Sequence, residues 1–127
     1  MKKMLLIAGL FCLALTSHLH AQSINNRNWK AYIADPINDT LVLHIHSDSS
    51  FVTNSRGEVM IRTNCTIVGD TLTLSDYGGG EHDCPDPGSY KISLKDKNFT
   101  LSPINDPCEG RAQALNGLKW TEVAKLP

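Results

Sequence analysis

The chain of 127 residues is long enough for one domain, and its 12 basic residues are balanced by 13 acidic residues. A formal net charge of -1 removes the usual electrostatic argument for binding to nucleic acid or to an anionic membrane surface. Hydrophobic residues make up 41% of the sequence, which excludes the collagen-like and strongly disordered classes. The composition therefore indicates a single globular domain.

The N-terminal segment 1–21 has the pattern of a secretory signal peptide. Lys2 and Lys3 precede the apolar stretch 4–15, and the small residue Ala21 closes the segment. The apolar stretch is well short of the roughly 20 residues that a membrane-spanning helix needs. We therefore expect cleavage after Ala21, which would leave residues 22–127 as a periplasmic or extracellular domain without a membrane span.

Short segments rich in β-branched residues, separated by turn signals, recur along the rest of the chain at intervals of roughly ten residues. This rhythm is typical of an all-β sandwich or barrel. The alternation is clean in the segment 41–46, where Leu41, Leu43 and Ile45 share one face. In chain order, the expected strands are 29–33, 41–46, 51–52, 59–67, 71–74, 90–94, 99–101 and 118–123.

One helix and one long loop interrupt this series. Before the last expected strand, Asp106 can cap a helix, Pro107 suits its first position and Glu109 would complete a capping box. Gly117 can take the left-handed conformation that ends such a helix. Between the fifth and sixth expected strands, the stretch 77–88 holds four glycines and two prolines, which predicts a loop.

Residues that could carry metal or catalytic chemistry are few. His44 and His46 lie on the same side of one strand, where two imidazoles can reach one metal ion, and His82 in the loop could add a third ligand. Histidines two positions apart are common by chance, so we interpret the pair as solvent-facing and predict no metal site. The sequence has no Gly-x-Ser-x-Gly motif, and the glycine run 78–80 lacks the lysine and Ser/Thr of a phosphate loop. We therefore expect neither a cofactor nor an enzyme.

The C-terminal half, roughly residues 70–123, carries a set of residues with a familiar spacing. The set comprises 71–74, Cys84, Gly88-Ser89-Tyr90, Asp106-Pro107-Cys108, Arg111, Leu115 and Trp120. In this order the set resembles small secreted bacterial lipocalin-like, or calycin-type, β-barrel proteins. Trp29 fits the first strand of that family, and Arg27 stands where the family has a glycine.

The resemblance implies an antiparallel up-and-down barrel of about eight strands, with one short helix before the last strand. It also implies a disulfide bond between Cys84 and Cys108, which would leave Cys65 unpaired. Because Cys65 alternates with apolar neighbours in its strand, we expect a buried and inert thiol. Arg111 would lie across Trp29 and close one end of the barrel by cation–π stacking. The alternative role for Arg111 is to bind an anionic ligand.

As to function, the resemblance implies a non-catalytic, monomeric binding protein for a small apolar or amphipathic ligand in the barrel mouth. An eight-stranded barrel can hold such a ligand, or it can be filled by its own side chains. The second hypothesis is a protein-binding barrel, such as a secreted inhibitor or an envelope interaction module, that acts through the loop 77–88. An open apolar cavity would favour the first hypothesis. The expected inward-facing residues are Leu41, Leu43, Ile45, Leu72, Leu74, Tyr90, Ile92, Phe99 and Leu101.

Overall fold

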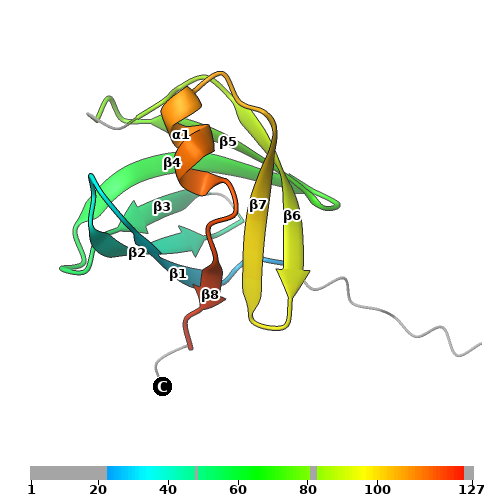
Figure 1. Cartoon of the computed structure of the whole chain (residues 1–127), viewed down its shortest axis with the longest axis horizontal. Coiled ribbons are helices and arrows are strands. Elements are labelled where there is room, and N and C mark those ends of the chain that lie inside the picture. Colours follow the sequence, from blue (N-terminus) through cyan, green and yellow to red (C-terminus); the bar gives the residue numbers. More distant parts are fainter. Residues whose placement is uncertain (1–22, 48, 81–82, 125–127) are drawn as a thin grey trace, which may run out of the picture.

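The structure is a computed structural model that describes residues 23–47, 49–80 and 83–124. The expected signal peptide therefore lies outside the described residues. Each expected strand and the expected helix is present, with small differences at the ends (Figure 1). The elements are β1 Asn28–Ile33, β2 Asp39–Ile45, β3 Ser50–Thr53, β4 Val59–Val68, β5 Thr71–Tyr77, β6 Gly88–Lys95, β7 Asn98–Asn105, α1 Glu109–Leu115 and β8 Trp120–Glu122.

The strands form a closed barrel in which each strand pairs antiparallel with the next, and β8 pairs with β1. The closing pair is short: Trp29 lies opposite Glu122, and Lys30 lies opposite Thr121. Arg27 supports this closure through an ion pair with Glu122, with an N–O distance of 3.5 Å. Closure removes the free sheet edges that would otherwise recruit other chains. The expected fold class is confirmed.

The antiparallel order gives the barrel two different ends. The start of β1 shares one end with the short connections 46–49, 69–70 and 96–97, and we call this the tight-turn end. The opposite end, the long-loop end, carries the connections 34–38, 54–58, 78–87 and 106–119. Helix α1 lies within the last of these connections, above the barrel and beside the end of β7 in Figure 1.

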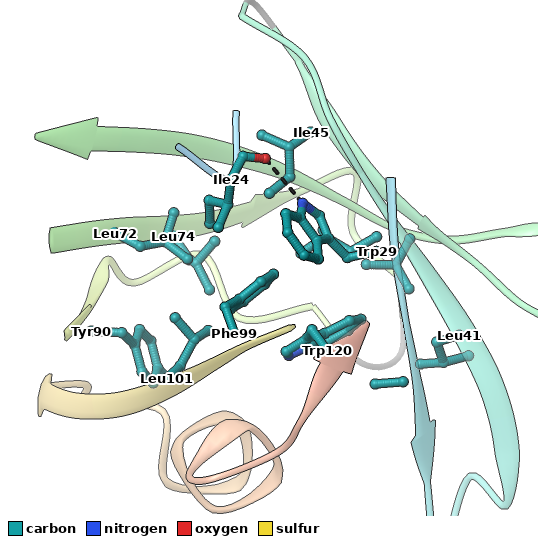
Figure 2. Packing of buried hydrophobic residues seen from close by; sticks show 13 residues of the cluster. Ile24, Trp29, Leu41, Ile45, Leu72, Leu74, Tyr90, Phe99, Leu101 and Trp120 are labelled. Atoms are coloured by element: carbon teal, nitrogen blue, oxygen red, sulfur yellow. Dashed lines mark hydrogen bonds between the residues drawn. The ribbon is translucent and has the colours of Figure 1, made fainter. Parts of the chain in front are cut away.

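Aromatic side chains fill the interior toward the tight-turn end (Figure 2). The ring of Trp29 is fully buried, and its Nε1–H donates a hydrogen bond of 3.0 Å to the carbonyl oxygen of Ile24. Phe99 meets Trp29 edge to face, with ring centroids 4.7 Å apart, and stacks on Trp120 at 6.1 Å. Edge-to-face and stacked pairs of this kind add to the free energy gained by burying apolar area. The segment around Ile24 thus seals the start of the barrel.

Two local predictions were wrong in detail. Strand β7 runs on past Pro103, beyond the expected end at Leu101. A proline has no N–H for the ladder, and a register shift between Ser89 and Tyr90 of β6 accommodates it. Helix α1 begins at Glu109, with Cys108 as its N-cap residue and no side-chain capping bond. Its expected end is confirmed, because Gly117 follows the C-cap residue with a φ of 72°.

In the part of the chain that the structure describes, no helix has the length and apolar character needed to cross a membrane.

The aromatic cluster predicts a strong dependence of stability on Phe99. Phe99→Ala should lower the free energy of unfolding by about 3–5 kcal/mol, because it removes a ring from between two tryptophans and leaves a cavity. Val68, which is 73% exposed, provides the control: Val68→Ala should change stability by about 0.5 kcal/mol or less. Urea unfolding of both variants and the parent measures the difference. Equal stability of the two variants would contradict the assigned core.

Candidate ligand-binding cavity

A cavity of about 860 Å³ opens at the long-loop end of the barrel. Its rim comprises residues 32–37 of the β1–β2 segment, residues 83–84 of the β5–β6 connection and one side of α1. The interior is packed toward the tight-turn end and the cavity lies toward the long-loop end, which favours a ligand site over a wholly filled interior. The apolar wall is formed by Leu41, Leu43, Val52, Ile61, Leu72, Leu74, Leu101 and Trp120.

The expected inward-facing residues divide into two groups. The leucines at 41, 43, 72, 74 and 101 line the cavity. Ile45, Tyr90 and Phe99 are buried and are not among the lining residues; Ile45 and Phe99 lie at the tight-turn ends of their strands. The five leucines belong to the same buried cluster and are at most 7% exposed. Ile92 is half-buried and packs against this core from its edge.

Some lining residues were not foreseen, and one of them could have been. Val52, Ile61 and Thr63 continue the inward faces of β3 and β4, and Asp76 continues the inward face of β5 after Leu74. The period-2 alternation of a strand applies equally to polar residues, so extending it by one step would have placed the Asp76 side chain inside. Asp76 was missed because we expected only apolar side chains to face the interior of the barrel.

The expected disulfide is present between Cys84 and Cys108, whose Cα atoms lie 6.3 Å apart. It joins the β5–β6 connection to the turn before α1. Cys65 is free and half-buried, with its side chain near the hydroxyls of Ser50 and Thr63. Burial raises the pKa of the Cys65 thiol, which keeps it protonated at neutral pH, as expected for an inert thiol.

Arg111 in α1 is the centre of a buried polar cluster at the rim. Its guanidinium binds both carboxylate oxygens of Asp106, with Nε–Oδ2 and Nη2–Oδ1 distances of 2.8 and 2.9 Å. It also donates to the main-chain oxygens of Cys84 at 2.9 Å and Asp86 at 2.6 Å. Asp76 lies 3.6 Å from Nη1. The Arg111 side chain is 10% exposed, so its hydrogen bonds act in a medium of low polarity.

The expected stacking of Arg111 on Trp29 is not formed. Trp29 lies at the start of β1, at the tight-turn end, whereas Arg111 lies in the β7–β8 connection at the long-loop end. Consecutive strands of an antiparallel barrel reverse direction, so β7 must finish at the end opposite to the start of β1. Trp29 packs with Phe99 and Ile24 instead. The guanidinium of Arg111 donates four hydrogen bonds to protein oxygens, so its role here is to connect segments of the chain.

Asp106 and Tyr90 complete the polar cluster. The Tyr90 hydroxyl donates a hydrogen bond to Asp106 Oδ2, and burial together with this bond raises the pKa of Tyr90 well above its ordinary value. Burial by itself would raise the pKa of Asp106, but hydrogen bonds from Arg111, Tyr90 and the Cys108 N–H lower it below the ordinary value. Asp106, expected to cap the helix, is thus committed to the Arg111 ion pair as well as to the Cys108 N–H.

The remaining polar groups of the cavity are sparse but buried. Asp76 is 7% exposed, and its Oδ2 accepts a 3.0 Å hydrogen bond from the Cys84 N–H. Thr63 is buried, and its hydroxyl is 3.3 Å from the Ser75 carbonyl oxygen, to which it can donate. The indole Nε1–H of Trp120 is buried with no hydrogen-bond partner among the described residues.

The histidines considered as metal ligands are held by other contacts. His44 Nε2 lies 3.0 Å from the Thr53 hydroxyl, and its ring stacks on Phe51 at a centroid distance of 4.4 Å. His46 lies 6.0 Å from the same ring, in a tilted arrangement. Burial, followed by the nearby His46, lowers the pKa of His44. His82 lies outside the described residues. The cluster of metal-binding types that the described residues do contain, Cys84, Asp86 and Cys108, includes both sulfurs of the disulfide.

Comparison with family models, with curated proteins and with solved structures finds no match to this chain. The closed antiparallel barrel with a helix before its last strand is compatible with a calycin-like fold.

Gly88 gives a direct test of the polar cluster. A Cβ atom there would lie 2.5 Å from Asp106 Oδ2 and 2.7 Å from Arg111 Nη2, so Gly88→Ala must displace the ion pair. We expect a large loss of stability. The matched control is Gly110→Ala in α1, where a Cβ atom meets nothing within 4 Å. Because alanine favours a helix over glycine by roughly 0.5–1 kcal/mol, this variant should unfold at an equal or higher urea concentration. A tolerated Gly88→Ala would contradict the close packing described.

The pKa of Asp106 predicts an acid dependence of stability. Its pKa is lowered on folding, so the charged carboxylate stabilises the fold above about pH 4, near the pKa in the unfolded chain. This contribution is lost as the pH falls through the lower folded-state pKa. Asp106→Asn should therefore be less stable than the parent at pH 7, and should lose less further stability on acidification below about pH 4. Urea unfolding across this pH range gives the free energy of unfolding of the parent and of Asp106→Asn as a function of pH. If both proteins lose stability equally on acidification, a group other than Asp106 causes the acid dependence.

Proposed function

We propose that this protein is a lipocalin-like binding protein that holds one small apolar or amphipathic ligand in the cavity at its long-loop end. The observation that carries the proposal is the cavity itself. Its volume of about 860 Å³ lies within the range typical of small-molecule sites, and its wall is made of aliphatic side chains from several strands. Burial of a ligand's apolar surface against this wall would supply the free energy of binding.

Further features support a lipocalin-like carrier. The aromatic cluster seals one end of the barrel, so a ligand would enter by the long-loop end. The Arg111 guanidinium and the Asp106 carboxylate hydrogen-bond with each other and with main-chain atoms, an arrangement suited to structure rather than to catalysis. The N-terminal sequence pattern supports export to the periplasm or the outside of the cell, where a small carrier can meet its ligand.

Protein recognition through the loop 77–88 has less support. Arg111 and the disulfide hold Cys84 and Asp86 of this loop beside the turn before α1, and Asp83 and Cys84 belong to the rim of the cavity. The loop therefore contributes to the mouth of the cavity, which favours the small-molecule proposal.

The proposal predicts that filling the cavity abolishes ligand binding. Ile61 lines the cavity, whereas its neighbour Arg62 is exposed on the outside of β4. Ile61→Trp should weaken binding of the neutral fluorescent probe N-phenylnaphthylamine by about tenfold or more, equivalent to about 1.4 kcal/mol. Arg62→Trp adds the same side chain outside the barrel and should leave the affinity unchanged.

Circular dichroism of both variants would establish that the barrel is intact, and Ile61→Phe offers a smaller substitution if tryptophan is not accommodated. Undiminished probe binding by a folded Ile61 variant would overturn the assignment of the cavity. Native mass spectrometry of the protein from its own host complements the test, because a retained small molecule would identify a ligand directly.

A further inference from the structure

The charges around the cavity are unbalanced. Its lining includes three acidic residues, Asp35, Asp76 and Asp83, and among the described residues Arg111 is its one Lys or Arg. That guanidinium is paired at two points with Asp106 and also lies 3.6 Å from Asp76, so the acids of this region still outnumber it. A mouth lined in this way carries a negative potential, and walls of low polarity concentrate such a field. The cavity therefore favours a positively charged ligand over a negatively charged one.

Asp76 is the most buried of these three acids. It continues the inward face of β5, directly after Leu72 and Leu74 of the apolar wall, and is 7% exposed. Its Oδ2 faces the Cys84 N–H and Arg111. No described residue donates a hydrogen bond to its Oδ1. Among the described residues, Oδ1 is not one of the enclosed polar atoms that lack a partner, so it is accessible from the cavity and can accept a hydrogen bond from a donor cation.

Trp120 belongs to the wall of the same cavity. Its ring lines the cavity and is 2% exposed, and its Nε1–H has no partner among the described residues. Buried indole N–H groups usually find an acceptor. Across the cavity wall, the Thr63 hydroxyl can donate to the Ser75 carbonyl and keeps its lone pairs available.

We propose that the ligand is an amphipathic amine: a protonated ammonium group bound at Asp76, with an apolar body lying against the leucines of β2, β5 and β7. The inference rests on the proposed function and specifies the class of ligand. A carboxylate ligand is disfavoured because the donors of Arg111 are directed at protein oxygens and an anion would approach three acids.

The test compares octylamine, octanol and octanoate as competitors of N-phenylnaphthylamine at pH 7, where an alkyl amine is protonated as a lysine side chain is. Octylamine should bind about tenfold more tightly than octanol, and octanoate most weakly. Asp76→Asn should remove the preference for the amine and leave the affinity for octanol unchanged. Asp96→Asn makes the same chemical change in the exposed β6–β7 turn, where a φ of 57° also suits asparagine, and should behave as the parent.

The possible outcomes test separately the binding function, the class of ligand and the position of the ammonium group. Absence of binding by the probe and all three competitors would overturn the proposed function itself. Equal binding of amine, alcohol and carboxylate would overturn the ligand class and leave the carrier function standing. An amine preference that persists in Asp76→Asn would contradict the placement of the ammonium group at Asp76. If Asp76→Asn does not fold, Asp76→Glu keeps the charge and should keep the preference, and the comparison in the parent protein still decides the class.

Discussion

The ion pair between Arg111 and Asp106 is the contact on which the long-loop end depends. Through it, and through hydrogen bonds to the carbonyls of Cys84 and Asp86, one guanidinium connects α1, the turn that follows β7 and the β5–β6 connection. Removing one partner of such a buried pair costs about 3–5 kcal/mol, because the other charge stays buried without compensation. The pair also explains why position 88 holds a glycine, since no Cβ fits beside it.

This arrangement at one end complements the aromatic packing at the other. The disulfide and Arg111 hold the loop and α1 around the mouth, while Trp29, Phe99 and Ile24 seal the tight-turn end. Between them the strands contribute aliphatic side chains to a space that is not filled from within. A short barrel can therefore combine a solid core, which supplies stability, with a cavity that supplies a binding site.

Period-2 patterning and turn residues were sufficient to predict the strands, because those signals are local. These local signals failed where the conformation of a residue depends on a partner that is distant in the sequence. Pro103 is accommodated in β7 by a register shift in the neighbouring strand β6. Asp106 pairs with Arg111 in addition to accepting a hydrogen bond from the N–H of Cys108 before the helix. The stacking of Arg111 on Trp29 was a different error, since the direction of each strand in an eight-stranded antiparallel order already places these residues at opposite ends.

The sequence by itself determined the all-β class, the helix before the last strand and the separate faces of the strands, because local propensity and alternation govern them. The resemblance added the pairing of Cys84 with Cys108. Only the tertiary structure decided which inward-facing side chains meet in a packed core and which surround a cavity. That outcome depends on strand register and on the height of each residue within the barrel, which no local pattern encodes. The same dependence brought Asp76 and Arg111 from two separate elements to one mouth, with Trp120 in the wall of the cavity.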